Sequence, residues 1–235
     1  MRFTTFLPVL LLGCSGPGPG PVDAGSHASA ALKACAAVQT PERVTTIAAA
    51  VTRLNALPAP VTPACFVAGL GRPLELVATT SVLSAQPAAG RENPRVFLLL
   101  PGLVVSVVSS GGGAPLLEFA QWMTPTRTLK GELELPFSAP LAEDAPFARV
   151  HTNLNVSSCG LCHRNEAPHP TIDGGFVSDA FRPEPTTLVP LSELVAQHTA
   201  CGEDTSERCE LFHALFDFGA VKQGAFSPSL ELFVQ

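Results

Sequence analysis

The chain is poor in the residues on which several functional classes depend. It has no tyrosine, one tryptophan and two methionines in 235 residues, and 14% of its residues are charged. Its 14 basic residues form no run that could follow a phosphate backbone, so we expect no nucleic-acid partner. No apolar stretch approaches the ~18 residues of a membrane-spanning helix. The G-x-S-x-G, H-E-x-x-H and P-loop patterns are also absent, so the sequence gives no argument for an enzyme.

The first 14 residues, MRFTTFLPVLLLGC, have the pattern of an export signal. One basic residue, Arg2, precedes a short apolar run that is too brief to cross a bilayer. The run ends in Leu11-Leu12-Gly13-Cys14, which resembles a bacterial lipobox. The resemblance implies that residues 1–13 are removed, that Cys14 receives the lipid, and that the lipid attaches the protein to a membrane. Ser15 stands where Asp would signal retention at the inner membrane, and this favours the outer membrane.

The composition after Cys14 divides the chain further. Residues 14–30 are rich in Gly, Pro, Ser and Ala and predict a flexible tether. Hydrophobic residues make up 46% of the chain, which predicts a folded body after the tether. We expect residues 31–149 to hold helices and a β domain. Residues 150–235 are expected to carry a loop region and the C-terminal helices, packed on the β domain as one unit.

Hydrophobic periodicity predicts an α+β fold. Residues 30–57 read as helices, with Thr40 as the N-cap of the second. Residues 63–136 contain about five short apolar segments separated by Gly and Pro, typical of an antiparallel β meander that forms a small sandwich or partial barrel. Two helices are expected near the C-terminus, the second starting at the capping pattern in residues 204–207.

Six cysteines remain after Cys14, and an exported protein meets an oxidising compartment that favours pairing. Cys201 and Cys209 frame a short polar link, so a Cys201–Cys209 disulfide would staple a C-terminal helical hairpin. A Cys35–Cys65 disulfide would tie the N-terminal helices to the first strand. Cys159 and Cys162 are then left as a separate pair.

The sequence Cys159-Gly160-Leu161-Cys162-His163 has the C-x-x-C-H spacing. Two thiols three residues apart on a helical turn can reach both vinyl groups of one porphyrin, and the adjacent histidine can reach the iron. The motif resembles that of c-type cytochromes, whose haem is attached outside the cytoplasm. This resemblance implies haem c bound covalently by Cys159 and Cys162, with His163 as the proximal iron ligand.

The resemblance covers these residues alone. Small cytochromes c usually carry a distal methionine after the motif, whereas the two methionines here, Met1 and Met123, both precede it. The remaining candidates are His198, which shares a helical face with Leu191, Leu194 and Val195, and His213, His151 and His169. We take His198 as the candidate distal ligand.

Other interpretations of the motif remain open. The two cysteines could form a structural or redox-active disulfide, or bind zinc together with His169. The sequence therefore leaves two hypotheses. The first is an exported haem lipoprotein for electron transfer or redox sensing at the cell envelope, with a redox partner protein. The second is a non-haem, disulfide-stabilised envelope lipoprotein that acts as a binding or structural module.

Overall fold

The protein is described by a computed structural model that covers residues 27–84, 86–138, 140–152 and 156–233. The predicted signal peptide, Cys14 and the predicted tether up to residue 26 lie outside these residues. Within the described segments, no helix is long and apolar enough to span a membrane.

Three helices precede the sheet: α1 (Ala30–Ala37), α2 (Ile47–Asn55) and α3 (Pro63–Ala68). Each begins at a hydroxyl N-cap whose oxygen accepts a backbone N–H three residues later. Thr46 caps α2, so the expected cap at Thr40 is wrong, and the residues between α1 and α2 are irregular. The α3 helix occupies a segment predicted as β, although Thr62 before Pro63 is a helix-start pattern.

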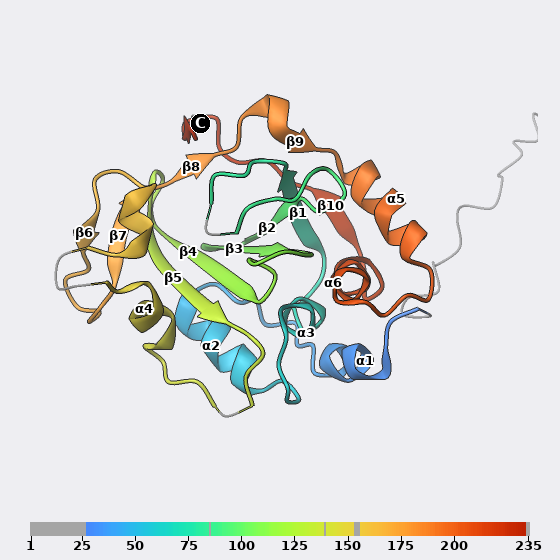
Figure 1. Cartoon of the computed structure of the whole chain (residues 1–235). Coiled ribbons are helices and arrows are strands. Elements are labelled where there is room, and N and C mark those ends of the chain that lie inside the picture. Colours follow the sequence, from blue (N-terminus) through green and yellow to red (C-terminus); the bar gives the residue numbers. More distant parts are fainter. Residues whose placement is uncertain (1–26, 85, 139, 153–155, 234–235) are drawn as a thin grey trace, which may run out of the picture.

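The predicted meander is present as β1 (Leu74–Thr79), β2 (Arg95–Leu100), β3 (Leu103–Val108), β4 (Leu116–Thr124) and β5 (Arg127–Glu134). Neighbouring strands in this series are antiparallel. They form one open sheet in the order β10-β1-β2-β3-β4-β5-β7-β6, with β9 also paired to β1. The structure therefore confirms an α+β fold with an antiparallel meander. The meander belongs to one sheet and not to a sandwich of two (Figure 1).

The region after Pro136 adds helix α4 (Ala145–Val150) and several short strands that the sequence did not predict. The short elements are η1 (Ser158–Leu161), β6 (Ala167–Pro168), β7 (Phe176–Asp179), β8 (Phe181–Arg182), η2 (Pro185–Thr187), β9 (Leu188–Val189), β10 (Val221–Gln223) and β11 (Glu231–Leu232). Because β7 pairs with β5 and β10 pairs with β1, both ends of the sheet come from the C-terminal region.

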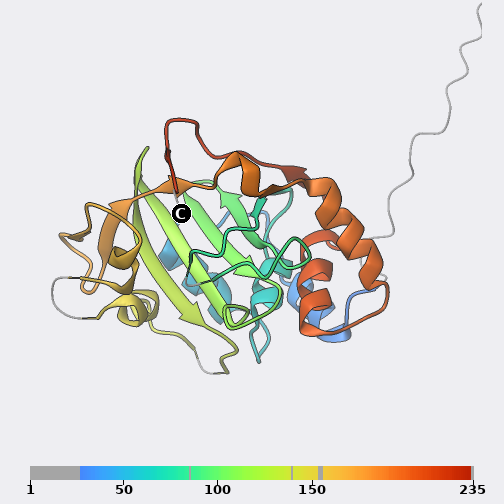
Figure 2. The ribbon, with the colours of Figure 1, turned by 45° about the horizontal axis from the view of Figure 1, so that its top comes forward.

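The two faces of the sheet have different coverings. On β3, Val105 and Val107 belong to the main hydrophobic core, together with side chains of α1, α2, α3 and α6. Val104 and Ser106 point to the opposite face, because side chains alternate along a strand. Figures 1 and 2 show the first three helices on one side of the sheet, with loops and the C-terminal segment across the other.

The two predicted C-terminal helices are present as α5 (Leu191–Cys201) and α6 (Glu207–Phe216), the latter capped by Ser206 within the predicted pattern, and β10 and β11 follow them. Both predicted disulfides are present. The Cys201–Cys209 bond links α5 to α6, as expected. The Cys35–Cys65 bond links α1 to α3, since Cys65 lies in a helix and not in the first strand.

Candidate functional site

The C-x-x-C-H motif folds as a single tight turn at the edge of the sheet. Ser157 caps the 3-10 helix η1, and its Oγ accepts a hydrogen bond from the Cys159 amide at 3.1 Å. Residues three apart lie on the same side of a 3-10 helix, which places Cys159 and Cys162 together. Leu161 lies between them in sequence and is 89% exposed, so it points away into solvent.

Glu166 stabilises the start of this turn through two hydrogen bonds to Ser157. Its Oε1 accepts the Ser157 amide at 2.7 Å and its Oε2 accepts the Ser157 hydroxyl at 2.5 Å. Gly160 gives the carboxylate room, because a Cβ at that position would lie 2.7 Å from Glu166 Oε1. The glycine inside the motif is thus explained by the approach of a carboxylate that fixes the start of the turn.

His163 is held with one ring nitrogen engaged and the other free. Its Nδ1 donates to the backbone carbonyl oxygen of Asp179 at 2.7 Å, and its ring stacks on Phe181 at 5.4 Å between centroids. Among the described residues, Nε2 has no hydrogen-bond partner. Proximal histidines in metal sites are commonly oriented by such an Nδ1–H bond, which leaves Nε2 as the ligand atom.

The motif borders a cavity of about 200 Å³ on the sheet face opposite the helices. Its floor consists of side chains of β2, β3, β4 and β5 that point away from the main hydrophobic core. Its sides are the motif, the loop around Ser84 and the segments near the C-terminus. Aromatic rings contribute much of the wall: Phe97, Trp122, Phe181, Phe226 and Phe233. Thus Cys159, Cys162 and His163 all line one cavity.

Several charged side chains share the cavity floor. Arg95 of β2 forms an ion pair with Glu118 of β4 across β3, and its guanidinium also donates to Ser106 at 2.9 Å. Lys130 is buried, with Nζ 3.3 Å from His163 Nδ1. The Oε1 atom of Glu118 and the hydroxyl of Thr128 are buried and have no hydrogen-bond partner within the described part of the chain.

Burial shifts the pKa values of His163, Lys130 and Cys159 towards the neutral form. It lowers the pKa of His163 to about 3, assisted by the nearby Lys130 charge. It lowers the pKa of Lys130 to about 8, and it raises the pKa of the Cys159 thiol to about 11. A neutral imidazole at pH 7 is the form that can bind a metal.

The donor set fits a c-type haem. Cys159 and Cys162 are free thiols, whereas the four other described cysteines are paired. The cavity is smaller than the ~300–1,000 Å³ typical of small-molecule sites, so a porphyrin requires it to widen. Its outer walls around Ser84, Pro183 and Phe226 lie outside the strands of the sheet.

The structure places the other candidate histidines elsewhere. His163 is the one histidine lining the cavity among the described residues, and no methionine lines it. His198 lies between α5 and α6, where its Nε2 contacts Asp217 Oδ1 at 2.6 Å and His213 lies beside it. His198 is therefore not placed to act as the distal ligand, because the helical face that carries it packs against α6 and not against the motif.

The alternatives for the two cysteines can be compared with this geometry. No Cys159–Cys162 disulfide is present, and Cys162 is exposed. His169 borders a different concavity together with His151, and its Nδ1 accepts the Ile172 amide at 3.2 Å. The alternative zinc site of Cys159, Cys162 and His169 therefore does not assemble among the described residues.

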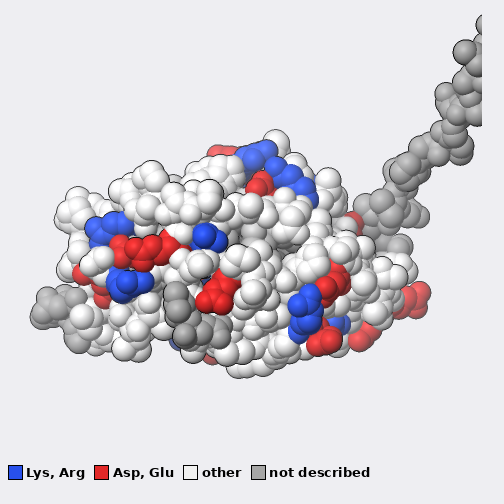
Figure 3. Space-filling model, turned by 90° about the horizontal axis from the view of Figure 1, so that it is seen from above, with Lys and Arg blue, Asp and Glu red and all other residues white. Residues whose placement is uncertain are grey.

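Sequence reasoning missed the residues of the cavity floor. Lys130 and Thr128 sit at alternate positions of β5, and both are buried. Only the packing of the motif and the C-terminal segments over that face encloses them. On the face in Figure 3, basic and acidic side chains lie beside each other and form no continuous basic track.

Comparison of the chain with protein-family models, with curated proteins and with solved structures found no match.

Proposed function

We propose that the protein is an exported lipoprotein that carries one covalent c-type haem and serves electron transfer or redox sensing at the cell envelope. Cys159 and Cys162 form the thioether bonds and His163 is the proximal iron ligand. The observation that carries the proposal is that one partly aromatic cavity is lined by both free cysteines and by His163, whose Nε2 has no hydrogen-bond partner among the described residues. When bound, haem supplies reversible one-electron chemistry.

The surrounding residues have defined parts in this proposal. The Asp179 carbonyl and the Phe181 ring fix the orientation of His163. Arg182 lines the cavity and provides a guanidinium group suited to carboxylates such as the haem propionates, whereas Arg95 is already paired with Glu118. The aromatic walls exclude water, which affects the reduction potential of a bound iron.

The direct test is a peroxidase-activity haem stain of the denatured full chain, produced in a host with cytochrome maturation machinery. The wild-type band should stain, because a thioether-linked haem survives denaturation. Cys159→Ala, Cys162→Ala and His163→Ala should lose most of the stain, and His169→Ala, a histidine outside the cavity, should keep it. An unstained wild-type band beside a stained control cytochrome would favour the non-haem binding or structural module instead.

The iron face opposite His163 has its own test. Because no second histidine and no methionine line the cavity in the described residues, we expect the sixth coordination position to be exchangeable. Carbon monoxide added to the reduced protein should shift the Soret band. An unchanged spectrum would show that a strong internal ligand occupies that position, and would leave the haem attachment itself untouched.

The lipid anchor is tested separately through Cys14, which lies outside the described residues. The full chain should partition with membranes and enter the detergent phase on phase separation. Cys14→Ala should abolish this partitioning, whereas Cys162→Ala should preserve it. Recovery of the Cys14→Ala chain in the membrane fraction would contradict lipidation at this residue.

A further inference from the structure

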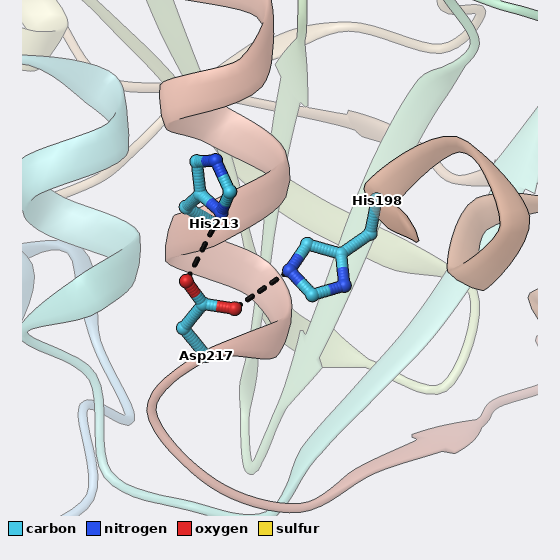
Figure 4. Close-up of side chains that lie close together, drawn as sticks. All are labelled: His198, His213 and Asp217. Carbon is cyan, nitrogen blue, oxygen red and sulfur yellow. Dashed lines mark hydrogen bonds and ion pairs between the residues drawn. The ribbon is translucent and has the colours of Figure 1, made fainter. Parts of the chain in front are cut away.

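A second group of metal-ligating side chains lies at the junction of α5 and α6, apart from the haem motif. His198 comes from the last turns of α5, His213 from α6, and Asp217 is the C-cap of α6 (Figure 4). One ligand atom from each of the three lies within 4.8 Å of the others, and no other such group occurs in the described parts of the chain.

Both imidazole rings contact the carboxylate of Asp217. His198 Nε2 is 2.6 Å from Asp217 Oδ1, and His213 Nδ1 is 3.0 Å from Asp217 Oδ2. His213 is fully buried and Asp217 is 6% exposed. His198 is the most accessible member, with a side chain 20% exposed, and provides a route for an ion to enter.

Two buried polar atoms of this group lack hydrogen bonds. His213 Nδ1 and Asp217 Oδ2 form no hydrogen bond despite their separation, and both atoms are inaccessible to solvent. His213 Nε2 lies 3.2 Å from the Asp204 carbonyl oxygen, to which it can only donate. In the neutral ring, Nδ1 then carries a lone pair that faces a carboxylate oxygen. Two acceptors in that position need either a proton or a metal ion between them.

We propose that His198, His213 and Asp217 bind a divalent transition-metal ion, with zinc as the preferred ion. Two imidazole nitrogens and one carboxylate oxygen are a common zinc ligand set, with water in the fourth position. Tetrahedral zinc ligands at ~2.0–2.2 Å lie roughly 3.4 Å from one another, so small side-chain rotations suffice.

The surroundings support a cation at this place. The Asp204 carbonyl fixes the His213 ring as an outer-shell partner. The C-terminal end of α6, where Asp217 lies, carries the negative end of the helix dipole. The Cys201–Cys209 disulfide lies one turn from His198 and one turn from His213, and holds the two ligand-bearing helices together.

The experiment is titration of the EDTA-treated full chain with ZnCl₂ by isothermal calorimetry. It is done in a Cys159→Ser, Cys162→Ser background, because free thiols bind zinc and would obscure the site. One equivalent of zinc should bind and raise the thermal midpoint. His198→Ala and Asp217→Asn should weaken binding at least tenfold, and His169→Ala should not. CoCl₂ should give the visible absorption of a tetrahedral cobalt site, and His198→Ala should abolish that absorption.

Two results would overturn the proposal: no zinc binding by the parent chain, or binding that His198→Ala leaves unchanged. The first result would mean that a proton, and not a metal ion, separates His213 from Asp217. Far-UV circular dichroism checks that each variant folds. His198→Ala decides the question if Asp217→Asn does not fold, because His198 is partly exposed. The result is independent of the haem proposal, since the parent chain here carries no haem-attachment cysteines.

Discussion

The Nδ1 atom of His163 donates to the backbone carbonyl oxygen of Asp179 at 2.7 Å, across the junction between the motif turn and the end of β7. The bond is possible because β7 extends the sheet beside β5 and brings its last residue under the turn. It fixes the ring plane and the tautomer, so Nε2 carries the lone pair. The ligand His163 in the five-residue motif is thus oriented by a backbone carbonyl 16 positions later in the sequence.

Thiol accessibility gives the first prediction. In protein made without haem maturation, iodoacetamide under native, non-reducing conditions should modify Cys162 before Cys159. Cys162 is exposed, whereas burial raises the pKa of Cys159 to about 11 and leaves little reactive thiolate. Peptide mass spectrometry over a time course measures both sites. If neither site reacts until a reductant is added, the two cysteines form a disulfide and the free-thiol geometry is wrong.

The turn behind the motif gives the second prediction. Glu166→Ala removes both hydrogen bonds to Ser157, and Gly160→Ala displaces the same carboxylate by steric overlap. Each variant should reduce the yield of covalent haem several-fold, because the cysteines are no longer held on one side of the turn. Glu184→Ala, an acidic cavity residue outside the turn, is the matched control. Equal haem content in all three variants would remove the positioning role of Glu166.

The buried Lys130 gives the third prediction, for haem-free protein. Its folded-state pKa of about 8 lies below the ordinary 10.5, so between these values the unfolded state binds more protons. The Lys130 contribution to stability therefore rises with pH across this window, and below pH 8 the buried charge is destabilising. Lys130→Met should be more stable than wild type at pH 7, on the order of 3 kcal/mol.

Urea unfolding at a series of pH values checks this prediction. The stability difference between wild type and Lys130→Met should shrink as the pH rises from 8 to 10. Taking the difference between the two chains removes most of the opposing effect of Cys159, whose folded-state pKa is raised. Lys222→Met, which changes an exposed lysine, is the control and should show no such trend. A pH-independent Lys130→Met difference would show that Lys130 is solvated.

The disulfides give the fourth prediction. The Cys35–Cys65 bond spans 30 residues and the Cys201–Cys209 bond spans 8. On loop-closure entropy, replacing the first pair by Ala should cost about 3.5 kcal/mol and the second about 2.5 kcal/mol. Denaturant unfolding of the two double variants measures both costs. The reverse order would indicate that local packing around α5 and α6 outweighs loop length.

The two disulfides should differ in their effect on zinc binding when they are removed. Loss of the Cys201–Cys209 bond should weaken zinc binding at His198 and His213, because both ligands depend on the register of α5 against α6. Loss of the Cys35–Cys65 bond should leave zinc affinity unchanged in protein that is still folded. Equal zinc affinity in both double variants would show that helix packing alone aligns the ligands.

The amino-acid sequence by itself determined the local elements and the close pairings. Alternating and apolar segments defined β1 to β5, and spacing predicted Cys201–Cys209, because these features depend on neighbours along the chain. The motif Cys159-Gly160-Leu161-Cys162-His163 also specified its own turn. The hydrophobic pattern did not identify α3, since an apolar run of six residues is ambiguous between helix and strand.

Only the tertiary structure decided what surrounds the motif. The burial of Lys130, the carbonyl that orients His163 and the aromatic walls come from strands and loops far apart in the sequence. The same holds for His198, which the helical pattern alone placed near a haem and which packing placed beside His213 and Asp217. Local sequence specifies local conformation, but a face of a helix or strand acquires its chemistry from whatever packs against it.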